Sequence, residues 1–534
     1  MSPTASRRDV NTQSNYNELV TTHAQVDLSV DFENRLLGGR VILDLAAINE
    51  TPVSEVILDT SYLKVREVGV NSRPCEWKVL PRSEPLGSPL KISLEKAVSK
   101  ERQSGDNSLY SFRQDIPIPS YLFALASGDI AKASIGPRST IATSPELLEA
   151  AKWEFEQDTE NYIQSLERIV YQYQWSEYNL LVLPPSFPYG GMENPVYTYV
   201  TPTTVSGDRE NVDVVAHELS HSFSGNLVTA ATWADFWLNE GWTTYLERRL
   251  QAALFGEPHR DFSAIIGWKA LCESVKEFGD HHEFTKLIPD VSGKDPDDAF
   301  STCPYEKGYT FLSYLESQVG KEKWNQYIPH YFTTFARRSL TSDEFKQDLH
   351  TFFASDSAAT AMLNAVDWHQ WFYSPGLPPK PTFDTSLADV CYSLAAQWEQ
   401  IGSRVFKPSQ DDIAGWKANQ VVVFLNAVQD FVEPLGEENA QKMGETYGFF
   451  KSSNTEITAR YFGVGLRSRA KVVYQPTADL LGDVGRMKFI RPLYKQLNAA
   501  DRELALATFE KNKDFYHPIC RSLVEKDLAV KRDQ

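Results

Sequence analysis

Cysteine is scarce in this sequence, and no two cysteines are spaced as a pair. The 534 residues include five cysteines, an odd number, and no Cys-x-x-Cys motif occurs. This usage argues against a disulfide framework and against a zinc site built from thiolates. It favours a protein that works in a reducing compartment.

Long apolar runs are missing as well. No stretch approaches the ~20 apolar residues that a membrane-spanning helix needs. The N-terminal sequence MSPTASRRDVNTQ lacks the apolar segment of a signal peptide. We therefore expect a cytoplasmic protein that does not insert into membranes, and we leave its presence in the nucleus open.

Positive charge is the third shortage. The chain has 53 lysines and arginines against 71 aspartates and glutamates, which gives a formal net charge of -18. Because nucleic acids and anionic membranes are densely negative themselves, nonspecific attraction to either is disfavoured. With 42% hydrophobic and 23% charged residues, the composition is otherwise that of a soluble globular protein.

Hydrophobic patterning changes twice along the chain. From Ala24 to about Ile130, short alternating segments separated by Gly, Pro and Asn predict antiparallel strands of a β-sandwich. Longer helical patterns follow, interrupted by the apolar strand YNLLVLPPSF. The segment YSPGLPPKPTFD then places four prolines between 375 and 381, which predicts an extended linker.

Beyond the linker the chain is predicted to be helical. In NQVVVFLNAVQDF, the apolar residues that recur at the spacing of one buried helix face are Val421, Phe424, Leu425 and Val428. A chain of this length exceeds one hydrophobic core. We expect a β domain at 1–129, a mixed α/β domain at 130–373, a linker at 374–384 and a helical domain at 385–534.

The strongest chemical signal is the motif HELSH. His217 and His221 are about one helical turn apart, so both imidazoles leave the same face of a helix and can bind one ion. Glu218 is rotated by roughly 100° from His217, which directs it at a water molecule on the metal rather than at the ion. The motif alone favours a metal site, but it is also compatible with two histidines that are solvated or hydrogen-bonded in a core.

A glutamate at a suitable distance strengthens the metal hypothesis. Glu240 is separated from His221 by 18 residues, enough for one helix to end at Gly225 and Asn226 and for a second to begin near Thr232. Catalytic zinc prefers histidine and carboxylate ligands with a fourth position left to water. The spacing therefore predicts that His217, His221 and Glu240 hold one Zn²⁺.

A second glutamate has two interpretations. Glu247 lies seven residues beyond Glu240, on the same helical face. From there it either braces a ligand histidine from behind or stays a solvated charge beside Arg248 and Arg249. The sequence does not separate the two.

The order and spacing of GGMEN, HELSH and WLNEG resemble the zinc aminopeptidases of the gluzincin class. The segments LLVLPPSFPYGGMENP, GNLVT, DPDDAFSTCPYEKG, YSPGLPP and GRMKFIRPL are similar specifically to the leukotriene A4 hydrolase family, from about Asp129 to the end of the chain. The resemblance implies a multidomain α+β protein. Its parts are an N-terminal antiparallel β-sandwich, a thermolysin-like mixed α/β zinc domain and a C-terminal all-α helical stack.

The resemblance also implies roles in peptide cleavage. Glu218 is expected to be the general base, Tyr305 the donor that stabilises the oxyanion, and Glu193 the anchor of the substrate's free amine. Because glycine has no Cβ, Gly190 and Gly191 let an extended substrate approach the backbone. The residues expected to contact the substrate are Tyr189, Gly190, Gly191, Met192, Glu193, Arg486 and Lys488. Without the family, GGMENP is typical of a surface turn and Tyr305 of a packing residue.

Three further charges matter for the other end of a substrate. By resemblance, Arg486 and Lys488 hold a carboxylate, and their spacing predicts that they share one face of an extended segment. Asp297 is implied to position water in epoxide opening or to contact a basic peptide side chain. Without the family, the two cations are typical of a solvated basic cluster and KDPDD of an acidic turn.

Two departures from the family pattern stand out. Phe300 occupies the position of a tyrosine in vertebrate members, as in the fungal branch, and we expect weaker epoxide hydrolysis from it. A family segment resembling QCQAIHCR and a PCQD turn, with a glutamine that shapes the amine pocket, is absent before LYSFRQDIPIPSYLFALASG. We therefore predict an incomplete, weakened β-sandwich.

Three functional hypotheses follow. The first is a zinc aminopeptidase for short peptides, with one Zn²⁺ per chain, that also hydrolyses leukotriene A4-like fatty-acid epoxides. The second is a peptidase only, similar to aminopeptidase B and selective for Arg or Lys. The third is a catalytically silent isoform that binds peptides. In each case we expect a monomer without nucleic-acid partners.

Overall fold

The computed structural model describes residues 8–49, 53–71, 73–94, 112–211, 213–402 and 406–530. The chain forms two compact units. Unit 1 contains Met1–Asp115, Ala231–Phe236 and Ile288–Ser301, and unit 2 contains Ile116–Ala230, Trp237–Leu287 and Thr302–Gln534. The domain boundaries expected from the sequence stay predictions.

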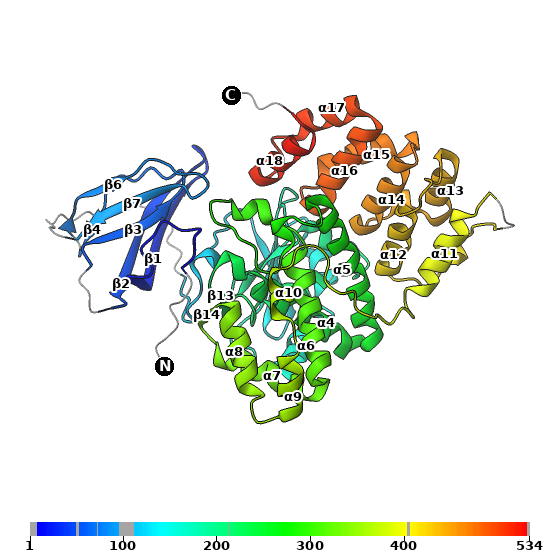
Figure 1. The fold of residues 1–534 in the computed structure, drawn as a ribbon. Helices are drawn as coiled ribbons and strands as arrows, with labels where there is room; N and C mark the ends of the chain where they lie inside the picture. Colours follow the sequence, from blue (N-terminus) through cyan, green and yellow to red (C-terminus); the bar gives the residue numbers. More distant parts are fainter. Residues whose placement is uncertain are drawn as a thin grey trace. The chain divides into compact units, whose positions relative to one another are not determined.

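Unit 1 is built from antiparallel strands, coloured blue in Figure 1. One ribbon pairs β1 with β2, a three-stranded sheet has the order β3-β7-β6, and β4 pairs with β5. The strands are β1 (Leu19–Asp31), β2 (Leu36–Ala47), β3 (Glu55–Thr60), β4 (Gly69–Val70), β5 (Arg73–Pro74), β6 (Trp77–Val79) and β7 (Ser88–Ser93).

The β1–β2 ribbon has one apolar and one polar face. The cross-strand pair Val26 and Val41 lies on the apolar face, and the ion pair of Asp27 with Arg40, 2.6 Å long, lies on the other. Val41 is 58% exposed. Among the described strands of the unit, one apolar cluster has three buried members, Val56, Leu90 and Ile92, with partly buried residues packed against them. An open apolar face beside so small a core agrees with a β-sandwich that lacks strands.

Unit 2 contains a five-stranded mixed sheet in the order β11-β12-β10-β9-β8. The central strand, β10, pairs in parallel with β9 and β12, and all four of its residues are buried. It is the strand predicted from the apolar run YNLLVL. The strands are β8 (Ala131–Gly136), β9 (Ser139–Thr143), β10 (Asn179–Val182), β11 (Gly191–Met192) and β12 (Tyr197–Val200), with a separate parallel pair β13 (Val228–Ala230) and β14 (Arg338–Leu340).

Ten helices of unit 2 precede the proline-rich segment in the described chain. They are α1 (Leu148–Phe155), α2 (Thr159–Ile169), α3 (Asp213–Ser220), α4 (Trp237–Phe255), α5 (Glu257–Phe278), α6 (Gly308–Val319), α7 (Lys321–Thr334), α8 (Ser342–Phe352), α9 (Ser357–Asn364) and α10 (Trp368–Tyr373). A π-helical turn, η6 (Cys303–Lys307), leads into α6. Helix α4 is buried on nearly all sides, with Trp237 and Trp242 fully enclosed.

The ends of α3 and α4 differ from the prediction. Helix α3 ends at Ser220 rather than at Gly225, and α4 begins at Trp237 rather than near Thr232. Gly225 has a φ of 103° and its N–H bonds the carbonyl of Val228 at 2.7 Å, so the chain turns there into β13. A further turn follows β13 before α4 begins.

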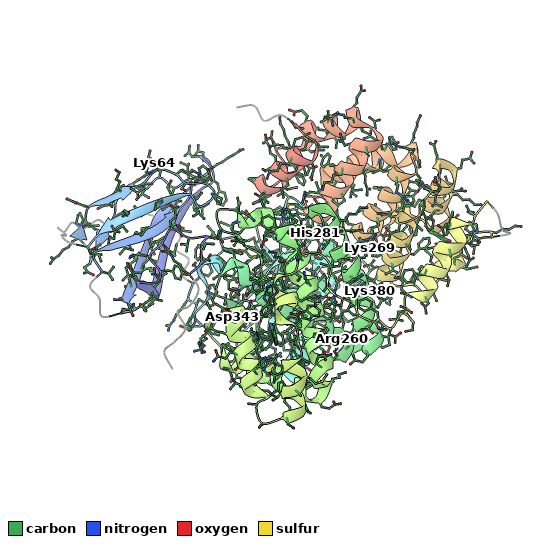
Figure 2. All side chains as sticks on the ribbon, viewed as in Figure 1. Lys64, Arg260, Lys269, His281, Asp343 and Lys380 are labelled. Atoms are coloured by element: carbon green, nitrogen blue, oxygen red, sulfur yellow. The ribbon has the colours of Figure 1, made fainter. Side chains whose placement is uncertain are left out.

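Buried ion pairs fix the helices around α4. Arg260 of α5, labelled in Figure 2, donates to Glu316 of α6 at 2.5 Å. Arg248 of α4 donates two hydrogen bonds of 2.7 and 2.9 Å to the carboxylate of Glu306 in η6. A buried arginine with a bidentate carboxylate partner orients both of the elements that carry the pair. These contacts hold η6 against α4.

The chain after the proline-rich segment forms a stack of helices. They are α11 (Asp389–Glu399), α12 (Ala418–Gln429), α13 (Glu437–Tyr447), α14 (Thr455–Arg467), α15 (Tyr474–Asp483), α16 (Met487–Ala500), α17 (Arg502–Asn512) and α18 (Pro518–Asp527). Helix α12 packs against α11 and α14 and buries all four residues of its predicted stripe. Within the described ranges, every helix is too short or too polar to cross a bilayer.

Unit 1 should unfold before unit 2, because its buried cluster is so small. Replacing Ile92 by Ala removes about 2–5 kcal/mol from that cluster and should lower only the first transition in differential scanning calorimetry. Replacing Leu312 of α6, which is fully buried, by Ala should lower only the second. A single transition shifted equally by both variants would contradict this expectation.

Candidate metal centre

Helices α3 and α4 bring three ligand atoms together. The Nε2 atoms of His217 and His221 lie 3.5 and 3.4 Å from Oε2 of Glu240. The two imidazole rings are 4.9 Å apart between centroids. His221 and Glu240 are buried and His217 is half-buried. The three ligands predicted from the sequence therefore meet at one point.

These spacings suit zinc. Nitrogen and oxygen ligands about 2.0–2.1 Å from a tetrahedral Zn²⁺ lie about 3.3–3.4 Å from one another. Oε2 of Glu240 is buried and has no hydrogen-bond partner among the described residues. Because an unpaired buried carboxylate oxygen is costly, a cation at this point satisfies it. The residues therefore fit the metal that the motif predicts.

The other nitrogen of each histidine is held from behind. Nδ1 of His217 lies 3.0 Å from Oε2 of Glu247, and Nδ1 of His221 lies 2.8 Å from the carbonyl oxygen of Ser224 and 3.1 Å from Oγ1 of Thr243. Carbonyl and carboxylate partners at Nδ1 leave both Nε2 atoms as the metal-facing ones. The contact between His217 and Glu247 agrees with the first interpretation of Glu247, in which it braces a ligand histidine, and not with a solvated charge.

The charges of the site also favour a cation. Burial acts to lower the pKa of His221, but the carboxylates of Glu193 and Glu240 outweigh it and raise the pKa to about 9. Burial acts to raise the pKa of Glu240, but the imidazoles of His221 and His217 lower it to about 2. Positive charge is thus stabilised at the point where the ligand atoms converge.

Glu218 lies beside the ligands without joining them. Its side chain packs on Gly191 so closely that a Cβ there would lie 2.3 Å from Oε1 of Glu218. Burial, opposed by the two histidines and reinforced by Glu193 and Glu240, raises the pKa of Glu218 to about 7. The glycine that the sequence offers as room for a substrate also makes room for this carboxylate.

Glu193 brings a second carboxylate to the same place. Ligand atoms of Glu193, Glu218 and His221 all lie within 4.8 Å of one another. The carbonyl oxygen of Glu193 accepts a hydrogen bond of 2.8 Å from Nδ2 of Asn226, which fixes the backbone of the GGMEN segment against the turn after α3. Two neighbouring carboxylates form an attractive site for an ammonium group.

Tyr305 stands in η6, next to the ligands. Its ring is stacked on that of His217, with centroids 5.9 Å apart and planes inclined by 24°. Gly241 of α4 and Gly308, the first residue of α6 directly after η6, let these two helices touch, because a Cβ on Gly241 would lie 2.8 Å from the Cα of Gly308. Burial and the carboxylates of Glu240, Glu193 and Glu218 raise the pKa of Tyr305, so its phenol is a proton donor.

Arg486 borders the same glycine pair from the other side. A Cβ on Gly190 would lie 2.6 Å from Nη2 of Arg486. Two backbone bonds hold this segment against the loop before GGMEN: Gly485 N–H to the Pro185 oxygen, 2.7 Å, and Met487 N–H to the Pro188 oxygen, 2.9 Å. Glu218 and Arg486 thus flank adjacent glycines.

The expectation of an extended segment for Arg486 and Lys488 is wrong. Arg486 is extended, with φ -65° and ψ 116°, but Lys488 lies in the first turn of α16. The two cations still converge, since Nζ of Lys488 lies 2.6 Å and Nη1 of Arg486 lies 3.5 Å from Oε1 of Glu456. They converge because the backbone changes from extended at Arg486 to helical at Lys488, and not because they share one face of a strand.

The remaining predicted residues have the following places. Tyr189 contacts Phe187 edge to face at 6.0 Å, and Met192 pairs with Tyr199 in β11 and β12. Asp297 belongs to unit 1, in the short helix η5 (Pro296–Ala299), where burial, Asp295 and Asp298 raise its pKa. Phe300 follows it in unit 1. The roles of Asp297 and Phe300 stay predictions.

Tyr121 was missed by the sequence analysis. Its hydroxyl accepts a hydrogen bond of 3.2 Å from Nδ2 of Asn239, the neighbour of Glu240. Burial, then the charges of Glu193 and Glu240, raise its pKa. Nothing local in the sequence distinguishes this residue among 24 tyrosines, because its place beside α4 is set by the tertiary fold.

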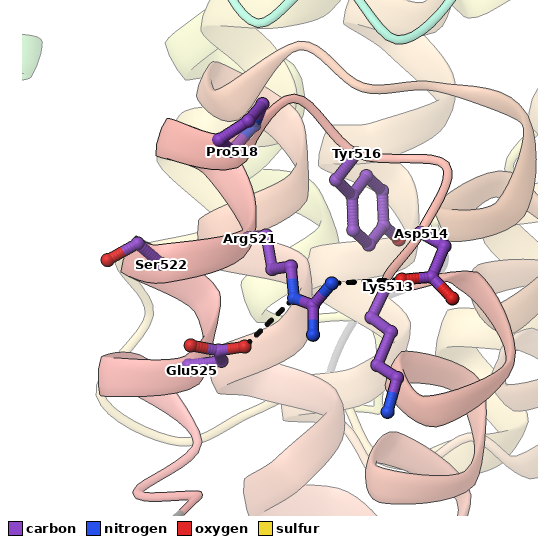
Figure 3. Close-up of a pocket in the computed structure, with 7 residues that line it drawn as sticks. All are labelled: Lys513, Asp514, Tyr516, Pro518, Arg521, Ser522 and Glu525. Atoms are coloured by element: carbon purple, nitrogen blue, oxygen red, sulfur yellow. Dashed lines mark hydrogen bonds and ion pairs between the residues drawn. The ribbon is translucent and has the colours of Figure 1, made fainter. Parts of the chain in front are cut away.

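A separate hollow of about 590 Å³ lies among the last helices, far along the sequence from the metal centre (Figure 3). Arg521 on its wall is paired with Glu525 at 3.0 Å and with Asp514 at 2.9 Å. Its charges therefore satisfy each other, and none of the predicted site residues lines it.

Two family models match the chain. The peptidase family M1 domain matches residues 153–371, and the C-terminal domain of leukotriene A4 hydrolase matches residues 416–528. The first match contains the three ligands, and the second contains the two cations that converge on Glu456.

Curated relatives align with nearly the whole chain. A "leukotriene A-4 hydrolase homolog" of Botryotinia fuckeliana is 52% identical over 98% of this chain and 94% of its own length. A "leucine aminopeptidase 2" of Sclerotinia sclerotiorum is 51% identical over 98% and 99%. Both alignments extend over 607 positions, more than the 534 residues of this chain, so the relatives carry residues that have no counterpart here.

Solved structures agree with the fold. A yeast LTA4 hydrolase in complex with bestatin superposes with a TM-score of 0.93 at 37% identity, covering 99% of both chains. An M1 zinc metallopeptidase from Deinococcus radiodurans, 18% identical, shares the fold over 71% of this chain with a TM-score of 0.52. The predicted arrangement of a β domain, a mixed α/β zinc domain and a helical domain is confirmed. The chain belongs to the M1 family of zinc peptidases, in its leukotriene A4 hydrolase branch, and is a hydrolytic enzyme.

Proposed function

We propose that this enzyme removes N-terminal residues from short peptides, with one Zn²⁺ per chain. The observation that carries the proposal is the carboxylate pair of Glu193 and Glu218, whose oxygens lie within 4.8 Å of each other and of a His221 nitrogen. One carboxylate binds the free ammonium of a peptide while the other handles a proton. The names of the leucine aminopeptidase relatives support the same activity.

Zinc has a defined contribution to this reaction. Held by His217, His221 and Glu240, it would polarise the first peptide carbonyl and lower the pKa of water toward ~7. Two observations support this ligand set. Oε2 of Glu240 has no hydrogen-bond partner among the described residues, and Nδ1 of each histidine has a polar partner that orients the ring.

Glu218 moves the proton. It accepts one from the attacking water and returns it to the leaving nitrogen, which suits a carboxyl with a pKa of about 7, able both to take up and to release a proton near neutral pH. Glu193 holds the substrate's amine, so that cleavage is measured from the free N-terminus. Tyr305 keeps its proton and donates a hydrogen bond to the oxygen on which negative charge develops.

Arg486 and Lys488 are suited to the C-terminal end of a peptide substrate. A short peptide extended over Gly190 and Gly191 has its reacting carbonyl near Glu218 and its C-terminal carboxylate toward Arg486. Arginine binds carboxylates with two parallel N–H bonds. Arg486 and Lys488 are therefore proposed as the carboxylate-binding pair.

Epoxide hydrolysis is a second candidate activity. The 52% identity with a leukotriene A-4 hydrolase homolog and the 0.93 TM-score with yeast LTA4 hydrolase support it. In this reaction Arg486 and Lys488 would hold the fatty-acid carboxylate and Asp297 would position water. With Phe300 in place of a tyrosine, we propose that it is the weaker of the two activities.

Replacing Glu218 by Gln should preserve bound zinc and reduce turnover by at least ~10²-fold, the usual share of a general base. Metal analysis and leucyl anilide hydrolysis measure the two effects. The matched control is Glu149→Gln, at an exposed position of α1, which should change neither. Comparable rates for wild type and Glu218→Gln would remove Glu218 as the base, and zinc-loaded wild type without turnover would favour the silent isoform.

Glu247→Gln should weaken zinc binding by about 10–100-fold, because His217 loses the carboxylate that orients it. Thr243→Val is the matched control: His221 keeps its 2.8 Å bond to the Ser224 carbonyl, so zinc affinity should change little. Competition with a chromophoric chelator measures both affinities. An equal loss of zinc affinity in the two variants would contradict the special role of Glu247.

A substrate panel separates the peptide and lipid hypotheses. We expect wild type to hydrolyse leucyl anilide faster than arginyl anilide, to convert a leukotriene A4-like epoxide more slowly, and to lose all three activities with a zinc chelator. A clear preference for the arginyl substrate without epoxide turnover would favour the peptidase-only hypothesis. Rates unaffected by metal removal would contradict the zinc mechanism.

A further inference from the structure

Lys307, the last residue of η6, has a buried ammonium group that binds backbone oxygens. Its Nζ atom donates to the carbonyl oxygens of Ser374 at 2.8 Å, Thr285 at 2.9 Å and Gly376 at 3.0 Å. The residue is 2% exposed. Burial lowers the pKa of its ammonium to about 8, so the group is still charged at neutral pH. Three acceptors use all three N–H groups of the ammonium.

The three carbonyls come from two segments that also bind each other. Thr285 ends the short helix η4 (Glu283–Thr285), and Ser374 and Gly376 begin the proline-rich segment after α10. The N–H of Gly376 donates to Oγ1 of Thr285 at 2.8 Å. Gly376 has a φ of 79°, and a Cβ there would lie 2.9 Å from the carbonyl oxygen of Asp280. The carbonyl cage around Lys307 is therefore built from fixed backbone.

Three successive side chains of η6 contact three different neighbours. The ring of Tyr305 stacks on His217 of α3, and the carboxylate of Glu306 accepts two bonds of 2.7 and 2.9 Å from Arg248 of α4. The ammonium of Lys307 binds the carbonyl cage. Because these tethers leave the turn in different directions, a rotation of η6 that moves Tyr305 has to break the contact of Glu306 or that of Lys307.

We propose that Lys307 is a positioning residue whose ammonium holds η6 against the carbonyl cage, so that the phenol of Tyr305 stays directed at the metal centre. The proposal rests on the role of Tyr305 in the aminopeptidase function proposed above. Without the ammonium, η6 loses its tether to the cage and is held by side-chain contacts with α4. A donor displaced by about 1 Å stabilises the developing oxyanion poorly.

Replacing Lys307 by Met keeps the length of the side chain and removes the ammonium. We expect kcat for leucyl anilide to fall by about 10- to 10²-fold. KM should stay within about twofold, because the loss concerns an interaction made only in the transition state. Zinc content should be unchanged, since none of the three ligands lies in η6. An unchanged kcat, or a loss confined to KM, overturns the proposal.

A double-mutant cycle tests whether Lys307 acts through Tyr305. Tyr305→Phe should lower kcat by about 10²–10³-fold, the usual cost of one oxyanion donor. In that background Lys307→Met should cause no further loss, because no phenol is left to position. If the two losses multiply, Lys307 affects the reaction by another route and this inference alone fails. If Tyr305→Phe leaves kcat unchanged, the proposed role of Tyr305 fails together with it.

Leu349→Ala is the control for loss of stability. Leu349 is fully buried in α8, so its truncation should lower the unfolding temperature and leave kcat unchanged below that temperature. If this variant loses as much kcat as Lys307→Met at an equal loss of stability, destabilisation explains the effect and the proposal is overturned.

Gly376→Ala supplies a second test if Lys307→Met does not fold. The added Cβ displaces one carbonyl of the cage and leaves the ammonium in place. It should lower kcat in the wild-type background and have no effect in the Tyr305→Phe background. A Gly376→Ala variant with the kcat of wild type overturns the proposal.

Discussion

The geometry of this enzyme depends on one buried carboxylate oxygen that meets two imidazole nitrogens at 3.4–3.5 Å. That oxygen, on Glu240, has no hydrogen-bond partner among the described residues and suits a cation, so α4 has to be held where the ligands converge. Fully enclosed tryptophans, Trp237 and Trp242, and the buried pair of Arg248 with Glu306 hold it there. The same helix carries Thr243 and Glu247, so one rigid element supplies a ligand and orients both histidines.

Close approach is the second constraint, and glycines satisfy it. Gly191 and Gly190 leave room for Glu218 and Arg486, while Gly241 and Gly308 let α4 touch the start of α6, directly after the turn that carries Tyr305. In each case a Cβ would stand where a functional side chain or its supporting backbone lies. The glycines of GGMEN therefore leave room for the enzyme's own charged groups, besides the room that is proposed for a substrate.

What could be predicted from the sequence was local or governed by chain length. The spacing within HELSH fixes two imidazoles on one face, and 18 intervening residues suffice to return Glu240 to them. The apolar run at 179–182 and the stripe of α12 were predictable because burial follows periodicity. Contacts made by the tertiary fold were not: Tyr121 beside α4, and Glu456 between Arg486 and Lys488, carry no local signal.

The division into two units bears on how the two proposed activities tolerate a short β domain. The ligands, Glu218, Glu193, Tyr305 and Arg486 all belong to unit 2, which has its own sheet and its own large core. Asp297 and Phe300, which the resemblance connects with epoxide opening, belong to unit 1, where the described strands form an apolar cluster with three buried members. The residues proposed for peptide cleavage therefore all lie in unit 2, whereas two of those that the resemblance connects with epoxide opening lie in unit 1. Loss of strands from unit 1 should consequently weaken the lipid reaction before the peptide reaction.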